Sequence, residues 1–315
     1  MHRIVPPALA VASVAAVVAA GALAGPAIRE AALTEVTFTA AERRDTLAYW
    51  TPDRMREVGA NAPLGHDSAA VRPWGGPEMR TVGRLFFTDE KGVDSYCTAT
   101  SVRGRNRSTV MTAGHCVQLP ASPGNHHTNM VFVPGYGEKS GEKNGDRSRA
   151  ESGEKSRAES GENRLPYGVF VIRAVVMPRS WEQDATTDVA AVVVDPRSGK
   201  ALADTVGGQQ LAVGRKPGGK VTVFGYPDSR EERGERLMHC SGTTSATPDG
   251  KQSVPCPMEG GSSGGPWLAG FDAKSGRGAL VSVNSFGDAE EGSSVMEGEV
   301  LGPLAGQVHA RAERL

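Results

Sequence analysis

The chain has 315 residues, and its 35 Lys and Arg residues nearly balance its 36 Asp and Glu residues, for a formal net charge of −1 at pH 7. This balance gives no reason to expect a nucleic acid or an anionic membrane surface as a binding partner. The 40 glycines and 20 prolines favour a turn-rich β fold over a helical one.

Residues 1–24 have the pattern of a secretory signal peptide. Arg3 belongs to a short basic start, residues 4–23 are almost entirely small and apolar, and small residues stand at the cleavage positions up to Ala24. The alternative is an uncleaved membrane anchor, because the apolar run approaches the length that spans a bilayer. Two early prolines and the small residues at the end of the run favour cleavage after Ala24. The sequence therefore predicts a secreted protein with no stable membrane association after cleavage.

Residues 25–75 differ from the rest of the chain and are predicted to be a pro-segment or an N-terminal arm. Residues 28–55 mix Ala, Glu and Arg in a way that is compatible with short helices. Residues 61–76 are rich in Pro, Gly and Ala, as is typical of a linker.

From about residue 81 the pattern becomes that of a β domain, with short runs of β-branched and aromatic residues. The run 189–194 is continuously apolar, as expected of a strand that is buried on both faces. A short terminal helix is expected over residues 308–315. The predicted strands are residues 82–87, 96–102, 109–112, 131–133, 169–177, 189–194, 211–213, 220–224, 267–268 and 279–284.

Residues 137–163 interrupt this pattern with a charged segment of low complexity. The heptapeptide at residues 148–154 recurs at residues 156–162, and the segment contains no apolar side chain larger than that of Ala. Such a segment buries too little apolar surface to offset the entropy of ordering it, so a disordered loop insertion is predicted. The alternative is a docking loop for a partner.

Four cysteines, Cys97, Cys116, Cys240 and Cys256, are consistent with an oxidising compartment. An even number of cysteines in an exported chain indicates disulfides, with three possible pairings. Pairing Cys97 with Cys116 and Cys240 with Cys256 would close two short loops, each contributing about 3 kcal/mol to stability. A zinc site is the alternative, but no Cys-x-x-Cys pair is present.

Two motifs carry the chemistry: residues 112–116 (Thr-Ala-Gly-His-Cys) and residues 261–266 (Gly-Ser-Ser-Gly-Gly-Pro). A serine hydroxyl is a weak nucleophile at neutral pH and needs a general base within hydrogen-bond reach, which a histidine on another strand end can supply. Glycines around a serine permit a sharp turn and leave room for a substrate carbonyl. Backbone N–H groups at such a turn can stabilise a developing oxyanion.

These motifs resemble those of the chymotrypsin-like (trypsin-fold) serine peptidases, particularly their secreted bacterial members, over about residues 80–305. The resemblance implies an all-β fold of two packed six-stranded Greek-key β-barrels with a short C-terminal helix. It implies a peptidase domain over residues 76–315. The expected function is that of a secreted serine endopeptidase acting on polypeptides through an acyl-enzyme intermediate, with no cofactor and no metal.

The resemblance also assigns catalytic roles to individual residues. His115 is the expected general base and Ser263 the expected nucleophile, because the pattern Gly-x-Ser-Gly-Gly places Ser263, rather than its neighbour Ser262, at the turn. Asp188 directly precedes the buried run 189–194 and is the expected acid, because the family's aspartate precedes a buried strand. Its alternatives are Asp184, in a polar turn, and Asp195, at the far end of that strand.

Further expectations concern the surroundings of the nucleophile. The N–H groups of Gly261 and Ser263 are expected to form the oxyanion hole. Residues Ser285, Phe286 and Gly287 match the family's substrate-binding strand, which pairs with an extended peptide; the alternative for Phe286 is an ordinary core aromatic. The resemblance makes Cys97 the partner of Cys116.

The chain departs from the zymogen-forming members of the family before the nucleophile. They have an Asp there that pairs with a freed N-terminus, whereas this chain has Ser262, so activation by N-terminal insertion is not expected. The adjacent His126 and His127 are a possible metal pair, but histidines in a polar loop are usually solvated. The alternative function is a catalytically silent protein-binding module on the same scaffold. A monomer is expected.

Overall fold

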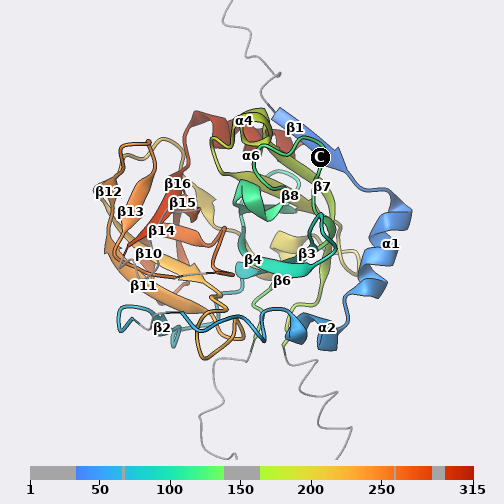
Figure 1. The fold of residues 1–315 in the computed structure, drawn as a ribbon, viewed down its shortest axis with the longest axis horizontal. Helices are drawn as coiled ribbons and strands as arrows, with labels where there is room; N and C mark the ends of the chain where they lie inside the picture. The colour runs from blue at the N-terminus through green and yellow to red at the C-terminus, as the bar shows by residue number, and fades with distance from the viewer. Residues whose placement is uncertain (1–32, 66–67, 138–163, 259, 286–294) are drawn as a thin grey trace, which may run out of the picture. The chain divides into compact units, whose positions relative to one another are not determined.

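The computed structural model describes residues 33–65, 68–137, 164–258, 260–285 and 295–315. The described strands form two sheets (Figure 1). The predicted signal peptide, nearly all of the predicted charged insertion, and the predicted substrate-binding residues Phe286 and Gly287 lie outside the described residues. No helix in the described ranges is both long and apolar enough to cross a bilayer.

The first sheet contains seven strands in the order β1-β7-β6-β3-β4-β5-β8, and an additional pairing of β7 with β8 closes six of them into a barrel. Strand β1 stays outside the barrel and pairs antiparallel with β7. The strands are β1 (Leu33–Thr37), β3 (Val82–Thr88), β4 (Asp94–Ser101), β5 (Thr109–Thr112), β6 (Thr128–Pro134), β7 (Phe170–Pro178) and β8 (Ala190–Val194).

Strand β8 confirms the prediction that the apolar run is buried on both faces. Ala190, Val192 and Val194 pack in one buried cluster with Leu85 and other residues of the barrel strands. The alternating positions, including Ala191, join a second cluster that also contains residues of the second sheet and the C-terminal helix. Because successive side chains of a strand point to opposite faces, the two alternating sets of side chains in this run pack in different core clusters.

The second sheet has nine strands, with the path β12-β13-β16-β15-β14-β10-β11-β2 and with β9 paired to β15. Its strands are β2 (Arg72–Pro73), β9 (Gln210–Leu211), β10 (Lys220–Gly225), β11 (Met238–Thr243), β12 (Ser245–Ala246), β13 (Gln252–Val254), β14 (Pro266–Asp272), β15 (Arg277–Asn284) and β16 (Met296–Val300).

This second sheet is a half-barrel, whereas two six-stranded barrels were expected. Among the described strands, β11 and β13 are not joined by a backbone ladder. Instead, a disulfide joins Cys240 of β11 to Cys256, and Gly242 packs against Val254 of β13. Prolines stand on both sides of Cys256 and cannot donate ladder hydrogen bonds. Strand β12, which follows β11 after one residue, pairs with β13, and the disulfide and the side-chain contact hold β11 itself beside this region.

The helices lie mainly around the first barrel (Figure 1). The predicted C-terminal helix is present as α6, which begins earlier than expected, at Pro303 in the first turn, a position that suits proline. Its buried residues Ala305, Val308 and Ala312 share one face, and the helix packs against β7 and β8. The helices are α1 (Ala40–Tyr49), α2 (Pro52–Glu57), η2 (Gly114–Cys116), α4 (Arg179–Asp184), α5 (Leu202–Val206) and α6 (Pro303–Ala312).

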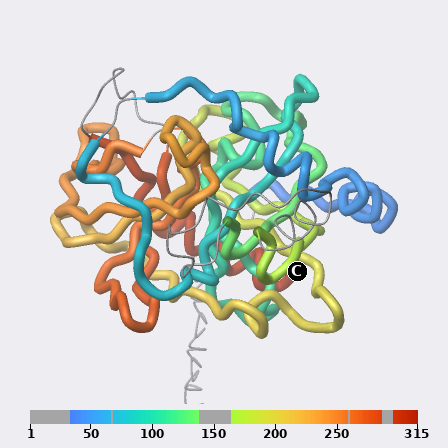
Figure 2. Tube along the Cα trace, turned by 90° about the horizontal axis from the view of Figure 1, so that it is seen from below, coloured from blue at the N-terminus to red at the C-terminus, as the bar shows by residue number. Residues whose placement is uncertain are grey.

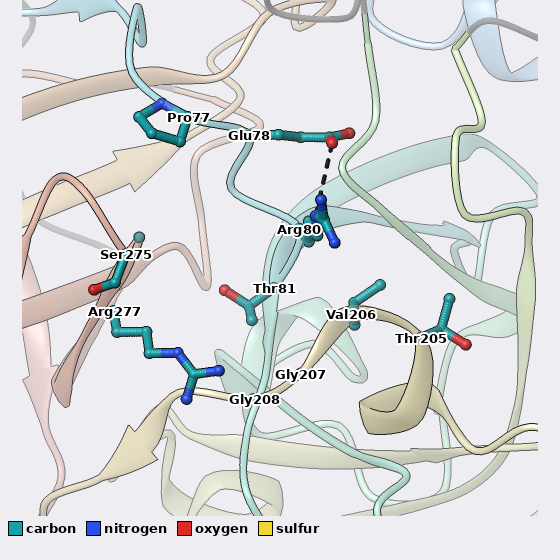
Figure 3. A pocket seen from close by; sticks show the side chains of 11 residues that line it. Pro77, Glu78, Arg80, Thr81, Thr205, Val206, Gly207, Gly208, Ser275 and Arg277 are labelled. Atoms are coloured by element: carbon teal, nitrogen blue, oxygen red, sulfur yellow. Dashed lines mark ion pairs between the residues drawn. The ribbon is translucent and has the colours of Figure 1, made fainter.

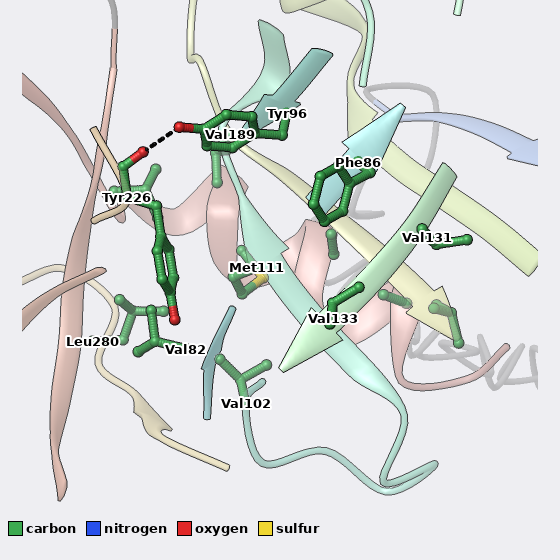
Figure 4. Packing of buried hydrophobic residues seen from close by; sticks show 14 of the residues in the cluster. Val82, Phe86, Tyr96, Val102, Met111, Val131, Val133, Val189, Tyr226 and Leu280 are labelled. Atoms are coloured by element: carbon green, nitrogen blue, oxygen red, sulfur yellow. Dashed lines mark hydrogen bonds between the residues drawn. The ribbon is translucent and has the colours of Figure 1, made fainter. Parts of the chain in front are cut away.

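Figure 4 shows the apolar core between the two sheets. Phe86 and Met111 come from the first sheet, and Leu280 from the second; all three are fully buried in one cluster. Tyr226 follows β10 and lies in the same cluster. The Tyr96 hydroxyl donates to the Tyr226 carbonyl at 2.8 Å, so a polar contact accompanies the apolar packing at the junction.

Residues 33–58, which belong to the predicted pro-segment or arm, are packed on the first barrel (Figures 1 and 2). Glu35 of β1 forms an ion pair with Arg311 of α6 at 2.7 Å. The Met55 side chain is 0% exposed and belongs to the core. The Val58 carbonyl accepts a hydrogen bond from the buried Arg84 guanidinium at 3.1 Å. Removal of this segment would therefore uncover apolar side chains and a buried charge.

We expect Met55→Ala to lower the free energy of unfolding by roughly 2–5 kcal/mol, because it leaves a cavity in the core. The control is Leu47→Ala in the neighbouring helix α1, where the side chain is 47% exposed and the loss should stay below about 1 kcal/mol. Urea unfolding of both variants measures the difference. Equal effects would show that this segment contributes no core packing.

Candidate active site

His115 lies in the turn that follows β5, within η2, and is buried. A disulfide joins the next residue, Cys116, to Cys97 of β4, so both predicted disulfides are present. The turn is thereby fastened to the strand beside it. The two sulfurs lie within 4.8 Å of a His115 ring nitrogen, but they are bonded to each other and offer no thiolate to a metal.

Gly114 allows the close approach of this turn to Asp188. A Cβ atom at Gly114 would lie 3.0 Å from Asp188 Oδ1 and 2.9 Å from the ring of Trp181. Any larger residue would therefore push the turn away from the carboxylate. The glycine lets the backbone N–H of His115 donate to Asp188 Oδ1 at 2.9 Å.

The structure brings Asp188 and His115 together. Asp188 Oδ2 lies 2.8 Å from His115 Nδ1 and also accepts a hydrogen bond from the Ser285 hydroxyl at 2.7 Å. Burial alone would raise the pKa of the Asp188 carboxyl, but attraction and hydrogen bonds from His115, with the bond from Ser285, lower it below its usual value. Because the carboxylate is ionised and only accepts, Nδ1 of His115 carries the proton and Nε2 faces away from Asp188.

The two alternative acids lie in other surroundings. Asp184 ends helix α4 and is exposed. Asp195 forms an ion pair with Arg43 of α1 at 2.8 Å. Of the three sequence candidates, Asp188 alone among the described residues contacts the His115 ring.

The loop that carries Ser263 is docked on the strands that lead to His115. The Ser263 carbonyl accepts from the Thr98 N–H at 2.8 Å, and the Gly261 carbonyl accepts from the Thr98 hydroxyl at 2.9 Å. Gly264 has φ +76°, and a Cβ atom there would lie 2.1 Å from Thr112 Oγ1. Only glycine therefore permits both this backbone conformation and this approach to β5.

The two adjacent serines differ in their surroundings. Ser262 is 1% exposed, and its hydroxyl donates to the Met258 carbonyl at 3.2 Å. Ser263 is only partly buried. This difference favours Ser263 as the serine that a substrate can reach.

Comparison with known proteins identifies the family. The model of the trypsin-like peptidase domain matches residues 97–273. The structure of the protease Anisep from Arthrobacter nicotinovorans is 31% identical, with 78% of this chain and 100% of that chain covered and a TM-score of 0.64. The chain belongs to the trypsin-like peptidases. The thermostable serine protease AL20 from an extremophilic microorganism is 30% identical, covers 75% of this chain and 98% of its own, and has a TM-score of 0.61.

A Glu endopeptidase is 16% identical, with 80% of this chain and 99% of that chain covered and a TM-score of 0.57, and at this identity only the fold is shared. A comparison with curated proteins gave no match. The all-β, trypsin-like fold predicted from the sequence is confirmed, and so is the classification as a serine-type endopeptidase.

Two residues of this trypsin-like peptidase support the candidate site in ways that the sequence did not indicate. Ser285 is predicted to bind substrate, and in the structure its hydroxyl donates a hydrogen bond to the Asp188 carboxylate. Asn284 ends strand β15, and its side-chain amide donates to the Ser262 carbonyl at 2.7 Å. The end of β15 therefore holds both the acid and the nucleophile loop.

His127 is buried, although the sequence predicted a solvated histidine. Its ring stacks on Phe87, with centroids 4.3 Å apart, and its Nε2 lies 3.1 Å from the His115 carbonyl. A carbonyl only accepts, so Nε2 is the donor. Burial lowers the pKa of His127, against the effect of this hydrogen bond. A neutral His127 therefore supports the backbone of His115.

Glu299 of β16 is a second carboxylate beside Asp188. Its Oε2 accepts the backbone N–H of Asp188 at 3.2 Å. Burial, together with repulsion from the Asp188 carboxylate, raises the pKa of Glu299 to about 7, although the Asp188 N–H and Lys251 act in the opposite direction. No pattern in the sequence indicates this contact, because it joins residues 111 positions apart.

A pocket of about 370 Å³ lies elsewhere in the peptidase (Figure 3). Its walls come from residues 77–78, 80–81, 205–208 and 275–277. Arg80 points toward Glu78, with 3.8 Å between their charged atoms. Among the described lining residues there is neither His115 nor Ser263, so this pocket is not the candidate active site.

The raised pKa of Glu299 predicts a pH-dependent stability. The fold favours the protonated carboxyl, so its contribution is fully present below pH 4.5 and is lost as the pH rises through about 7. Gln carries no charge at either pH. The free energy of unfolding of Glu299→Gln, relative to that of the parent protein, should therefore increase from pH 5 to pH 8 by at most about 3 kcal/mol. Urea unfolding at both pH values measures this gain.

The control for this measurement is Glu313→Gln at the end of α6, which should show no comparable gain. A gain for Glu299→Gln that is the same at pH 5 and pH 8 would contradict the assigned ionisation.

Proposed function

We propose that the protein is a secreted serine endopeptidase that hydrolyses peptide bonds through His115, Asp188 and Ser263 and an acyl-enzyme intermediate. The observation that carries this proposal is the 2.8 Å contact between His115 Nδ1 and the buried Asp188 carboxylate. The docking of the Ser263 loop on the strands that lead to His115 supports it.

The roles follow from the protonation states. Asp188 holds His115 with its proton on Nδ1, so Nε2 is the basic nitrogen. His115 Nε2 accepts the proton of the Ser263 hydroxyl while Oγ attacks the scissile carbonyl carbon. The imidazolium then donates that proton to the leaving amine, and the acyl group stays on Oγ. Water attacks the acyl-enzyme by the same proton transfers and releases the acid.

The oxyanion of each tetrahedral intermediate is proposed to bind the N–H groups of Gly261 and Ser263. Within the described part of the chain, neither N–H has an acceptor. Both donors are therefore available to a substrate oxygen. Ser285, Phe286 and Gly287, which continue from strand β15, are proposed to pair with the extended peptide substrate.

We further propose that residues 1–24 direct export and are removed. Two disulfides are consistent with an oxidising compartment. Because residues 33–58 complete the core of the first barrel, this part of the predicted pro-segment or arm stays with the mature enzyme, and the peptidase domain includes it. Ser262 stands where an N-terminal ion pair would need an acid, so activity does not depend on a freed amino terminus. The enzyme acts on polypeptides as a monomer, without a cofactor.

A fluorophosphonate probe tests the nucleophile directly. The parent protein should be labelled covalently, and Ser263→Ala should not, because the probe bonds only an activated Oγ. Ser262→Ala is the matched control and should still be labelled, since it removes the adjacent hydroxyl. A folded parent protein that resists the probe would instead indicate a catalytically silent binding module.

The acid is tested by Asp188→Asn, which keeps the side-chain shape but does not hold His115 in the required tautomer. We expect kcat to fall by roughly 10⁴-fold, the effect of this change in related serine peptidases. Asp184→Asn, four residues earlier at the exposed end of helix α4, should change kcat less than about twofold. Hydrolysis of a chromogenic peptide ester measures both variants. Similar losses in both would remove Asp188 from its proposed role.

A further inference from the structure

Glu299 contacts the backbone, not the carboxylate, of Asp188. Its strand β16 pairs with β15, with Glu299 opposite Val283, and the Glu299 carbonyl accepts from the Ser282 hydroxyl at 2.6 Å. The backbone of Glu299 is therefore held by the second sheet. Its side chain reaches across to the segment that leads into β8 of the first sheet.

The peptide bond that Glu299 contacts follows a strained residue. Thr187 has φ +61°, a left-handed conformation that is a genuine outlier for a β-branched residue. Such strain persists only where the surroundings hold it. The Thr187 carbonyl also accepts the Val189 N–H at 2.8 Å, so the chain turns sharply at Asp188. This turn points the Asp188 carboxylate at His115 and the Asp188 N–H at Glu299.

The groups around Asp188 and Glu299 explain which of these two carboxyls stays ionised. Asp188, Lys251 and Asp249 act on Glu299 electrostatically, and Lys251 also lies 3.8 Å from Glu297. Asp188 has three hydrogen bonds to its carboxylate. Within the described residues, the Glu299 carboxyl accepts one hydrogen bond, from the backbone N–H of Asp188. Of the two neighbouring carboxyls, Glu299 is therefore the one that takes up a proton first.

We propose that Glu299 is a positioning residue for catalysis: its carboxyl oxygen accepts the Asp188 N–H and holds the left-handed turn at Thr187 that presents Asp188 to His115. This inference rests on the proposed function, because it gives Asp188 the role of the triad acid. Without the acceptor, the turn relaxes toward an unstrained conformation and the Asp188 carboxylate moves relative to the imidazole. The hydrogen bond needs a carboxyl or amide oxygen and does not need a negative charge.

Two variants of equal length isolate this hydrogen bond. Glu299→Gln removes the charge but keeps an oxygen acceptor, and Glu299→Met removes both. At pH 8, kcat per active site should be roughly tenfold lower for Glu299→Met than for Glu299→Gln, as expected for a lost buried hydrogen bond, with KM values within about twofold. Glu299→Leu repeats the comparison with a second apolar side chain.

The concentration of active sites is measured by titration with the fluorophosphonate probe, so that misfolded protein does not enter kcat. Glu313→Ala is the control, because Glu313 also accepts a backbone N–H from a distant segment, that of Arg105, at 3.1 Å, and its kcat should not change. Thr187→Gly tests the strain, because glycine adopts the left-handed turn without cost. When this substitution is also present, the difference in kcat between Glu299→Gln and Glu299→Met should become smaller.

Equal kcat per titrated site in the Gln and Met variants would overturn the inference, as would a Gln-to-Met difference that Thr187→Gly leaves unchanged. A structural role alone would lower the fraction of titrated protein and leave kcat per site intact. The proposed function fails separately, if the parent protein is not titrated at all or if Asp188→Asn remains active.

Discussion

Asp188 is a carboxylate with 2% of its surface exposed, and an ionised group in that position is stable only when its oxygens and its backbone are fully hydrogen-bonded. The first sheet supplies two donors from His115. The second sheet supplies the Ser285 hydroxyl and the Glu299 acceptor for the Asp188 N–H. The buried charge is therefore compensated only when the two sheets are packed together, which links the folding of both to one site.

Thr98 of β4 also holds this junction. Its N–H and hydroxyl donate to carbonyls of the loop that carries Ser263, and the same hydroxyl oxygen accepts the Tyr226 N–H at 3.0 Å. Apolar packing between the sheets, as in the cluster that contains Phe86 and Leu280, is less directional than these bonds. Packing therefore brings the sheets together, and Thr98 sets the register of the loop against the His115 turn.

Stability and chemistry make different demands on this junction. The charge on Glu299 costs stability above about pH 7, and the left-handed Thr187 costs roughly 1–3 kcal/mol of backbone strain. The surrounding scaffold offsets both. The Cys97–Cys116 disulfide fastens the His115 turn, His127 supports its backbone, and Met55 packs into the core cluster that joins the two sheets.

The sequence by itself determined the class of fold, because strands such as residues 109–112 and 189–194 carry their burial pattern locally. It also indicated His115 and Ser263, because each lies in a short motif of consecutive residues. It missed β1 and β16, whose short sequences mix charged and apolar residues and become strands only by pairing with β7 and with β13 and β15.

Only the tertiary structure decided which acid meets His115, why His127 is buried, and that Glu299 faces Asp188. Those contacts join residues that are 73, 12 and 111 positions apart. Local propensity is a property of neighbouring residues, whereas the partner of a buried polar group depends on which distant segment the packing brings within hydrogen-bond distance.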